Sequence, residues 1–505
     1  MSTETMIQQF PLFINGQWTP VSSGETFDVI NPATGEVAAK VAKASPTEVD
    51  LAVQNARDTF ESGVWSGKSP AERAQVLIRF SEKIIEHANE IIYLEAISSG
   101  GTIRKLGGAD IQQLVLTIQQ TADLALKYQY VETLPIVSAL GPSRNQIIRE
   151  PIGVVAAITP WNFPLILAMW KIAPALAMGN SIVVKPASNT PLGTLKLAEI
   201  AIEAGLPPGV FNVITGPGST IGEALVTHPE VDKVAFTGST EVGRRIMKQA
   251  SGTVKKVTLE LGGKAPAIVL PDADLEIAIP GILFGVFFHS GQVCESGTRL
   301  LVHESIYEEV LQKLAAMAST IKLGNPLDPA TGMGPVVSKQ QMETILSYIE
   351  SGKEEGARLV CGGKRATGSG LDQGYFIEPT IFADVNNDMR IAQEEIFGPV
   401  LSVIKYSTEE EAIEIANDTI YGLSGGIWTR DLVKANKIAS KIKAGTIWIN
   451  DWHMFRNDAP FGGYKQSGVG RELGKNVLDE YTEIKHIHTA LTSENNQRPA
   501  LKLLF

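Results

Sequence analysis

The chain has 505 residues, a length that predicts two or three domains rather than one hydrophobic core. Its hydrophobic share of 44% and charged share of 20% indicate an ordinary globular protein. The net charge of -11 argues against a nucleic-acid partner, because phosphate binding requires a surplus of Lys and Arg. With only 2 cysteines a disulfide framework is excluded, so we expect a reducing compartment, the cytoplasm. The sequence predicts no secretion signal and no membrane span.

A long amphipathic helix is predicted from Pro70, with Ser69 as its N-cap and Glu72 completing a capping box. Apolar residues at helical spacing extend this helix to Glu95. Residues 131–150 break the helical period and predict an extended segment that makes a subunit contact.

From residue 152 the pattern alternates between strands rich in Val and Ile and helices. Strands are predicted at 152–158, 181–184, 211–215, 233–237 and 256–261, and helices at 165–177, 190–205, 219–227 and 239–250. This alternation predicts a doubly wound parallel sheet, which binds ligands at the carboxyl ends of its strands. A second α/β series is expected from about 265 to about 426, with a helix at 305–321 and strands at 401–404 and, further on, 446–450.

One of the two cysteines lies in the polar, Gly-flanked segment 288–297, FHSGQVCESG. A free cysteine is most often a small buried hydrophobe, and we interpret Cys361 in that way. Beside Cys294, however, Gly291 and Gly297 allow backbone amides to approach a ligand. Cys294 is therefore a candidate nucleophile, provided that local dipoles or cations lower the pKa of its thiol.

Three further polar positions have two interpretations each. Glu260, between two leucines, is either a surface-facing strand residue or a carboxylate with a raised pKa that activates water. Asn162, in TPWNFP, either ties down its loop or donates a hydrogen bond to an oxyanion beside the thiol. Lys185 either holds ribose hydroxyls or is a solvated strand end. Of Glu394 and Glu395, one is expected to accept hydrogen bonds from a sugar.

Two Gly-rich loops, TGPGSTIG at 215–222 and FTGSTEVG at 236–243, each lead from a strand into a helix. Helix N-termini with capping Ser attract phosphate. Neither loop has the strict G-x-G-x-x-G spacing, but two such loops on one sheet favour a dinucleotide ligand.

In this order the motifs resemble those of the NAD(P)-dependent aldehyde dehydrogenase superfamily, from about Leu12 to His488. The resemblance is carried by TPWNFP, KPAS, FTGSTEVG, LELGGK, GQVCESGTR, EEIFGPV and PFGGYKQSGVGRELG. It implies a doubly wound, Rossmann-like cofactor domain, a second α/β catalytic domain and a small β-ribbon oligomerisation element that joins a homodimer or homotetramer. The expected domains are 1–130 with 151–262 for the cofactor, 263–465 for catalysis and 131–150 with 478–490 for oligomerisation, before a tail at 491–505.

The resemblance also implies the oxidation of an aldehyde to a carboxylic acid with NAD or NADP, and no metal. Cys294 would attack the aldehyde to give a thiohemiacetal, and hydride transfer to the nicotinamide would leave a thioester. Glu260 would activate the water that hydrolyses the thioester, and Asn162 with the Cys294 amide would form the oxyanion hole. The implied cofactor contacts are Ile158, Thr159, Pro160, Trp161, Lys185, Ser188, Gly218, Phe236, Gly238, Ser239, Val242, Leu261, Glu395 and Phe397. The implied substrate tunnel comprises Phe163, Leu167, Trp170, Phe288, Val293, Glu295, Phe455 and Phe461.

Two positions depart from the family's pattern. Ser188 stands where members selective for NAD have a Glu that binds the adenosine-ribose hydroxyls, so NADP is expected to be accepted. Glu295 follows the nucleophile, where small or neutral residues are common. We expect it to pair with a local cation such as Arg456; otherwise it faces the tunnel and disfavours aldehydes that bear a carboxylate. The many aromatic residues favour medium-chain or aromatic aldehydes.

Two other functions remain open. A relative that transfers the acyl group to coenzyme A is disfavoured by Glu260, because such relatives typically lack this base. A binding or structural derivative without activity is disfavoured by the intact Cys294, Glu260 and Asn162.

Overall fold

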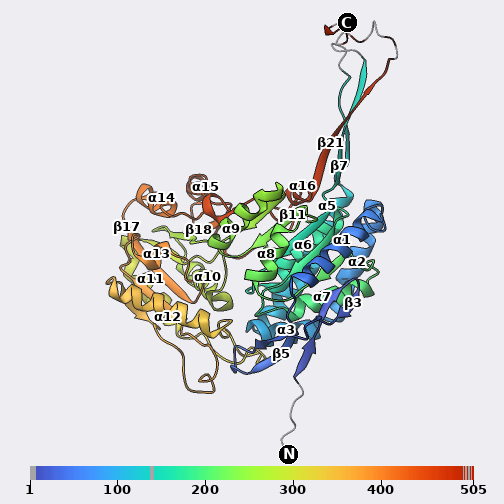
Figure 1. Cartoon of the computed structure of the whole chain (residues 1–505). Coiled ribbons are helices and arrows are strands. Elements are labelled where there is room, and N and C mark those ends of the chain that lie inside the picture. Colours follow the sequence, from blue (N-terminus) through green and yellow to red (C-terminus); the bar gives the residue numbers. More distant parts are fainter. Residues whose placement is uncertain are drawn as a thin grey trace, which may run out of the picture.

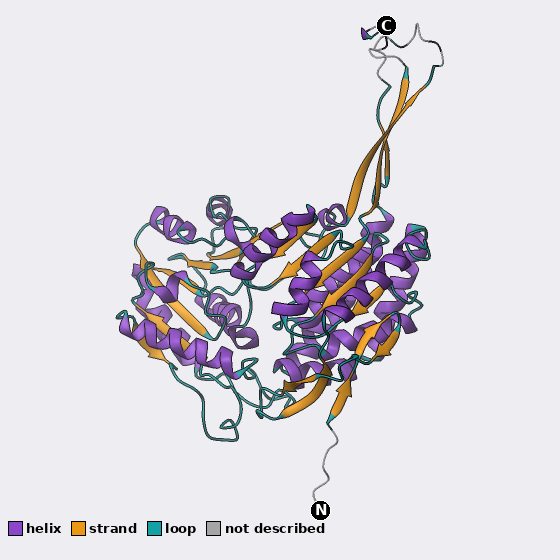
Figure 2. Cartoon of the chain, viewed as in Figure 1, coloured by secondary structure: helices purple, strands orange, loops and turns teal. Residues whose placement is uncertain are grey.

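The computed structural model describes residues 7–136, 142–492, 494, 498, 501, 503 and 504. Two α/β lobes lie beside each other, and a thin ribbon of strands projects from one of them (Figure 1, Figure 2). Part of the expected oligomerisation segment (137–141) and much of the expected tail at 491–505 lie outside the described residues, as do residues 1–6. Within the described part of the chain, no helix has both the length and the apolar character that a membrane crossing requires.

The first lobe is built on an eight-stranded sheet whose five central strands are parallel. Strands β20, β2 and β3 join its edges in antiparallel orientation. The strand order is β20 (Gly468–Val469), β12 (Lys256–Glu260), β11 (Lys233–Thr237), β8 (Val154–Ile158), β9 (Ser181–Lys185), β10 (Phe211–Val213), β2 (Leu12–Ile14) and β3 (Gln17–Thr19).

Helices cover both faces of this sheet because successive strand residues point to opposite faces. In β8, Val155 and Ala157 belong to one hydrophobic core, whereas Val154, Ala156 and Ile158 belong to the other. The first core is closed by α2 (Pro70–Glu86), α3 (Ala88–Ser99), α5 (Ile111–Leu126), α6 (Pro164–Ala177) and α7 (Leu192–Glu203). The second core is closed by α1 (Pro46–Glu61), α8 (Glu223–Thr227) and α9 (Thr240–Ala250). The predicted doubly wound sheet is confirmed.

The second lobe contains a seven-stranded sheet, parallel except for its edge strand β15. Its order is β15 (Arg358–Cys361), β16 (Thr380–Ala383), β17 (Val400–Tyr406), β14 (Arg299–His303), β13 (Pro266–Val269), β18 (Ser424–Trp428) and β19 (Thr446–Ile449). One face packs against α10 (Leu275–Phe287) and α11 (Tyr307–Ala318). The other packs against α12 (Lys339–Glu354), α13 (Arg390–Gln393), α14 (Glu409–Asn417) and α15 (Leu432–Ala439).

Several predicted helices have different limits in the structure. The helix expected from Pro70 to Glu95 is two helices, because α2 ends at Glu86 and His87 has non-helical backbone angles (φ -93°, ψ 8°). The helix expected at 219–227 begins with a π-helical turn, η2 (Gly218–Gly222), before α8. The helix expected at 305–321 begins with a 3-10 turn, η5 (Glu304–Ile306), and α11 ends at Ala318.

Two small sheets complete the fold. The N-terminal one contains β1 (Gln8–Phe10), β5 (Val37–Ala42) and β4 (Thr26–Ile30). The projecting ribbon contains β21 (Thr482–Ala490), β7 (Ser143–Pro151) and β6 (Val131–Thr133), and β21 follows the short helix α16 (Asn476–Glu480). In the ribbon, β21 pairs with β7 along its whole length, and both strands leave the first lobe together (Figure 1).

Candidate active site

The carboxyl ends of four neighbouring parallel strands bring the expected cofactor residues together. Ile158 at the end of β8 pairs with Lys185 at the end of β9, and Thr237 at the end of β11 pairs with Glu260 at the end of β12. Phe236 also pairs with Ile158, so all four ends lie at one edge of the sheet. This edge is the place where a doubly wound sheet binds ligands.

Cys294 lies in the loop between α10 and β14, opposite this edge. The loop turns sharply, because three successive residues have left-handed backbone angles: His289 (φ 48°), Ser290 (φ 58°) and Gly291 (φ 72°). Such angles cost free energy in residues other than Gly, so they persist where the surroundings impose them. A Cβ on Gly291 would lie 2.2 Å from the carbonyl oxygen of Gly398, which explains why this position is a glycine.

Cys294 lines two cavities that meet at its side chain, together with Leu167. One cavity, of about 230 Å³, reaches the strand ends of the first lobe. The other, of about 270 Å³, has six Phe and Trp rings among its lining residues, and we call it the aromatic cavity. A thiol at such a junction can contact a ligand in either cavity, so the structure brings the expected nucleophile between the expected cofactor and substrate residues.

Asn162 is 2% exposed, and its side-chain Nδ2 donates a hydrogen bond to the carbonyl oxygen of Gln292, at 2.9 Å. Gln292 is fixed in turn, because its Oε1 accepts from the Val337 amide at 2.9 Å. The amide group of Asn162 is therefore held beside the loop that carries Cys294. The Nδ2 group has two N–H donors, so a second one is available to an oxygen ligand, as an oxyanion hole requires.

Glu260 is 5% exposed, and its Oε2 has no hydrogen-bond partner among the described residues. Burial raises the pKa of Glu260 well above its ordinary value, and the negative charge of Glu472 adds to this effect. Glu472 itself pairs with the buried Lys171. The surface-facing interpretation of Glu260 is therefore wrong, because the end of β12 is enclosed by the segment that contains β20.

Glu295 is the acidic residue in contact with the thiol, whereas Glu260 is not among the lining residues of either cavity. Cys294 Sγ donates to Glu295 Oε2 at 3.0 Å, and Glu295 Oε1 lies 2.9 Å from Nδ1 of His453. The expected pairing with Arg456 is wrong. Arg456 is exposed and forms two hydrogen bonds with Asp458, two residues further on, at 2.9 and 2.7 Å. His453 takes this place, because its side chain is buried beside Glu295 whereas that of Arg456 is exposed.

Half of the expected cofactor residues line the smaller cavity: Pro160, Trp161, Gly238, Ser239, Leu261, Glu395 and Phe397. Asn162, Thr237, Gly262 and Gln341 line it as well. Ser239 caps α9 by accepting from the Val242 amide at 3.4 Å. Glu395 Oε1 accepts from the Gly263 amide at 2.9 Å, and burial raises the pKa of Glu395 to about 7. Glu394 is instead bonded to Tyr348 and Arg390 at the surface.

The other expected cofactor residues do not line this cavity: Ile158, Thr159, Lys185, Ser188, Gly218, Phe236 and Val242. Ile158 and Phe236 are buried strand residues at the same sheet edge. Lys185 is buried rather than solvated; its Nζ donates to the carbonyl oxygens of Pro186 (2.6 Å) and Gly216 (3.2 Å). Burial lowers the pKa of Lys185 to about 8. Ser188 Oγ donates to the same Gly216 oxygen at 3.1 Å.

Two observations show that this edge fits a polar ligand. Thr159 Oγ1 is buried without a hydrogen-bond partner among the described residues. No described atom lies within 4 Å of the position that a Cβ on Gly218 would occupy, so the turn that leads into α8 is open. An orphan hydroxyl and an open glycine turn at strand ends are features of a dinucleotide site.

The larger of the two cavities at Cys294 contains all but one of the expected substrate residues. These are Phe163, Leu167, Trp170, Phe288, Glu295, Phe455 and Phe461. Val293, the exception, is 3% exposed and does not line the cavity. Sequence reasoning missed Phe284, Ile166, Gln113 and Met454, whose positions on α10, α6, α5 and the 451–458 loop become lining positions only through tertiary packing.

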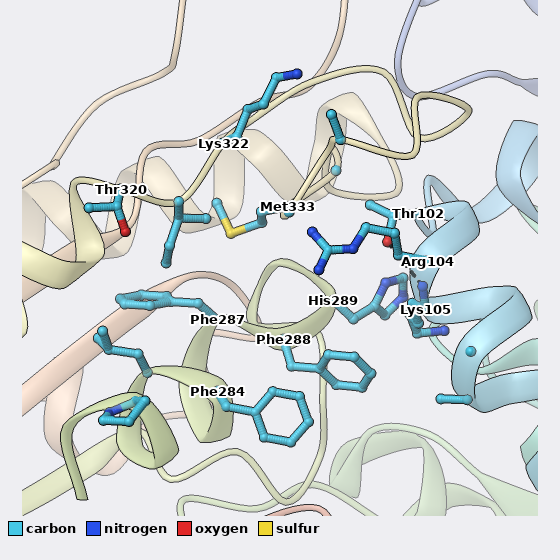
Figure 3. A pocket seen from close by; sticks show the side chains of 18 of the residues that line it. Thr102, Arg104, Lys105, Phe284, Phe287, Phe288, His289, Thr320, Lys322 and Met333 are labelled. Carbon is cyan, nitrogen blue, oxygen red and sulfur yellow. Dashed lines mark hydrogen bonds between the residues drawn. The ribbon is translucent and has the colours of Figure 1, made fainter. Parts of the chain in front are cut away.

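A third cavity, of about 720 Å³, adjoins the aromatic cavity and shares Phe284 and Phe288 with it. Figure 3 shows Arg104, Lys105 and His289 close together along its wall, with Phe284 and Phe288 nearby. Lys105 is paired with the buried Asp110, and its Nζ lies 4.2 Å from the centre of the Phe163 ring.

Comparisons with known proteins agree with this arrangement. The family model described as "Aldehyde dehydrogenase family" matches residues 18–487. Betaine aldehyde dehydrogenase of Bacillus subtilis (strain 168) is 47% identical over 490 residues, which cover 97% of this chain and 98% of the relative.

Solved structures give the same result. Betaine aldehyde dehydrogenase from Staphylococcus aureus in complex with NAD+ has a TM-score of 0.93 at 43% identity, covering 96% of this chain and 95% of that one. The NAD+ complex of aldehyde dehydrogenase from Bacillus cereus has a TM-score of 0.93 at 46% identity, covering 96% and 97%. The predicted family is thus confirmed: the chain belongs to the aldehyde dehydrogenase family and is an enzyme of that family.

Proposed function

We propose that the chain oxidises an uncharged medium-chain or aromatic aldehyde to the carboxylic acid, with NAD+ or NADP+ as the oxidant. The observation that carries this proposal is the position of Cys294, whose thiol lies where the aromatic cavity meets the cavity at the strand ends. A nucleophile at this junction can hold the substrate covalently while the cofactor lies on its other side.

The side chains around the thiol support separate roles. Cys294 attacks the carbonyl carbon, and the oxygen that becomes negative is held by Asn162 Nδ2 and the Cys294 amide. A bound nicotinamide would supply the acceptor for the hydride that leaves the former aldehyde carbon, and Cys294 would then carry a thioester. Glu260 then takes a proton from the water that hydrolyses the thioester. The buried carboxylate of Glu260, with one oxygen unpartnered among the described residues and a raised pKa, suits such a base.

The strand-end cavity supports a nicotinamide dinucleotide as cofactor. Relatives at 43% and 46% identity have been solved with NAD+. The Trp161 and Phe397 rings form an edge-to-face pair in the wall of this cavity, with centroids 5.1 Å apart. Lys185 and Glu395 would hold the two ribose groups. The N-terminus of α9, which Ser239 caps, would hold the pyrophosphate.

Ser188 supports acceptance of NADP+ as well as NAD+. Its hydroxyl is neutral and bound to a carbonyl oxygen, so it presents no charge that would repel a 2′-phosphate. We expect Ser188→Glu to lower kcat/KM for NADP+ by on the order of 10²-fold and to spare NAD+. Steady-state rates with both cofactors test this; a wild-type enzyme that uses NADP+ about 100-fold less well than NAD+ would overturn it.

The aromatic cavity supports the substrate class. Trp170, Phe455 and Phe461 form a cluster in which the three ring centroids lie 5.2–5.7 Å apart. Such rings favour an alkyl chain or an aromatic ring, while the carboxylate of Glu295 disfavours an aldehyde that bears a second carboxylate.

The same rings and carboxylate also support a second candidate, betaine aldehyde. Aromatic faces attract a quaternary ammonium group, and a nearby negative charge adds to this attraction. The relatives at 47% and 43% identity carry the name betaine aldehyde dehydrogenase. Among hexanal, benzaldehyde, betaine aldehyde and succinic semialdehyde, the highest kcat/KM decides between the candidates.

The decisive experiment combines this panel with three variants. Cys294→Ser should abolish formation of reduced nicotinamide, whereas the matched control Cys361→Ser, on edge strand β15, should retain it. Glu260→Gln should give a stoichiometric burst followed by turnover reduced by about 10²–10⁴-fold, because the thioester accumulates. Products formed with and without coenzyme A distinguish hydrolysis from acyl transfer. Turnover by Cys294→Ser, or no turnover of any aldehyde by the wild type, would contradict the proposal.

A further inference from the structure

The nucleophile contacts one carboxylate, and it is not the one that serves as the water-activating base in the mechanism above. Cys294 Sγ donates to Glu295 Oε2 at 3.0 Å, whereas no hydrogen bond between described residues joins it to Glu260. Glu295 is 3% exposed, and its main-chain oxygen accepts from Trp452 Nε1 and Ser424 Oγ, both at 3.1 Å. The carboxylate is therefore held on the aldehyde side of the sulfur by a rigid backbone.

His453 fixes the other oxygen of this carboxylate. Its Nδ1 lies 2.9 Å from Glu295 Oε1, and the two side chains are 5% and 4% exposed. The ring is held between Phe284 and Phe288, with centroids 5.2 and 5.5 Å away. A linear chain of hydrogen bonds thus runs from Cys294 through Glu295 to His453, and each side chain orients the one before it. This arrangement is typical of an activated nucleophile.

We propose that Glu295 is the base that removes the proton of the Cys294 thiol, and that His453 is the positioning residue that aims its carboxylate at the sulfur. This inference rests on the proposed function, in which Cys294 is the nucleophile. The site then holds two carboxylates with different roles, because Glu295 serves the sulfur and Glu260 serves the water.

The step balances without another reactant. The S–H bond of Cys294 breaks and its proton passes to Glu295 Oε2, while the electron pair of that bond forms the S–C bond to the carbonyl carbon. The π pair of the C=O bond moves to the oxygen beside Asn162. When water has later cleaved the thioester, the S–C pair returns to sulfur and Glu295 returns the proton, so the resting pair is restored.

The surroundings explain why the thiol needs a base in contact with it. Burial raises the pKa of Cys294 well above its ordinary value, and the negative charges of Glu295, Glu395 and Glu260 add to this effect. Asp110, the remaining acidic group that lines the aromatic cavity, is neutralised by Lys105. No free cation of the described residues faces the sulfur, so thiolate must be formed by local proton transfer rather than by a lowered pKa.

The test measures alkylation of Cys294 by iodoacetamide in the absence of aldehyde, from about pH 6 to about pH 8. With Glu295 as base, the wild-type rate should vary little over this range, because the proton moves within the pair. In Glu295→Gln the rate should rise about tenfold per pH unit, as for a simple thiol, and at about pH 6 it should fall by about 10²-fold. Glu295→Asp, which shortens the carboxylate by one methylene, should behave like Glu295→Gln and covers the case in which the first variant does not fold.

Matched variants separate positioning from folding. His453→Phe removes the hydrogen bond to Glu295 and should steepen the pH profile, while His453→Asn, which can still donate to the carboxylate, should restore most of the flat profile. Asp458→Asn removes an exposed carboxylate in the same loop and should change neither the profile nor the melting temperature.

The outcomes distinguish this inference from the function on which it rests. A wild-type alkylation rate that rises tenfold per pH unit, or a Glu295→Gln profile as flat as that of the wild type, overturns the role of Glu295 even where aldehydes are oxidised normally. A flat wild-type profile that Glu295→Gln steepens supports it, whatever aldehyde the enzyme uses. In aldehyde turnover, kcat/KM of Glu295→Gln should fall by about 10²-fold without the burst expected for Glu260→Gln.

Discussion

At the scale of single residues, Gly263 allows the main chain to approach the nucleophile loop closely. A Cβ at this position would lie 2.4 Å from the carbonyl oxygen of Cys294 and 3.2 Å from Cβ of Leu423. The neighbouring Gly262 is constrained in the same way, because its Cβ would lie 2.4 Å from Glu395 Oε2. The two glycines of LELGGK are therefore required by close packing, Gly263 against the nucleophile loop and Gly262 against Glu395.

We predict that Gly263→Ala displaces the Cys294 main chain and lowers kcat/KM by about 10²-fold, because a misplaced nucleophile loses the orientation that accelerates the attack. The overall fold should persist, as shown by an unchanged far-ultraviolet circular dichroism spectrum. Gly252→Ala is the matched control, since no described atom lies within 4 Å of its Cβ position. Full activity of Gly263→Ala would show that the loop adapts.

Glu472 adds to the effect of burial on the protonation of Glu260. Burial and the charge of Glu472 both raise the pKa of Glu260, so the base loses its proton at a higher pH than an ordinary carboxyl group. We predict that Glu472→Gln lowers this pKa, so Glu260 stays ionised to a lower pH. The acidic limb of the pH–rate profile for thioester hydrolysis should therefore shift to lower pH. Single-turnover hydrolysis rates against pH measure the shift. Glu483→Gln, an exposed change on β21, should leave the limb in place.

The sequence predicted most individual site residues but not their partners. Cys294 and Glu260 could be singled out because each stands in a polar or Gly-rich break next to apolar strands. The partner of Glu295 could not, because Arg456 and His453 are equally near in sequence. The choice follows from tertiary packing, because His453 is buried between Phe284 and Phe288 whereas Arg456 is exposed.

At the scale of elements, α1 carries a capping box that reaches beyond the helix itself. Glu48 Oε2 accepts from the Ser45 amide (2.8 Å) and hydroxyl (2.6 Å), while Oε1 accepts from the Ser22 amide (3.1 Å) and hydroxyl (2.7 Å). Burial alone would raise the pKa of Glu48, but the hydrogen bonds from Ser45 and Ser22 outweigh burial and lower the pKa to about 2. The carboxylate thus ties the start of α1 to the preceding strand–turn segment.

We predict that the stability contributed by ionised Glu48 is fully present above about pH 4.5 and is lost as the pH falls towards about 2. The sign follows from a folded-state pKa that lies below the unfolded value. The difference in unfolding free energy between wild type and Glu48→Gln, measured by denaturant titration, should therefore shrink as the pH falls. Glu61→Gln, exposed at the other end of α1, should show no such pH dependence; an equal dependence would contradict the prediction.

Element limits were harder to predict than element types. The helical period continues from α2 into α3 because Phe80, Ile84, Ile91 and Leu94 all enter the same hydrophobic core. The apolar pattern therefore reports the shared core and not the break at His87. The central strands β8, β9 and β11 were easier, since each is buried along its whole length and contains a short run of apolar residues.

At the scale of the whole molecule, the projection of the ribbon away from the first lobe is not explained by packing within one chain. β21 and β7 extend away from the first lobe (Figure 1), and among the described strands β21 pairs with β7 on one side only, so its other edge is open. Ile484 and Ile487 on β21 are 62% and 38% exposed. An open strand edge with apolar side chains is typical of a surface that pairs with another chain.

We predict that the chain forms a homodimer or homotetramer through this ribbon and that the double variant Ile484→Lys with Ile487→Lys lowers the mass in solution. Lysines at an edge oppose pairing because their charges must be desolvated or brought together. Light scattering coupled to size-exclusion chromatography measures the mass.

Val433→Lys on α15, where Val433 is 82% exposed, is the matched control and should leave the mass unchanged. The lining residues of both active-site cavities lie outside β21, so both variants should keep the alkylation behaviour of Cys294. A wild type that is already a single chain, or a double variant of unchanged mass, would assign the ribbon another purpose.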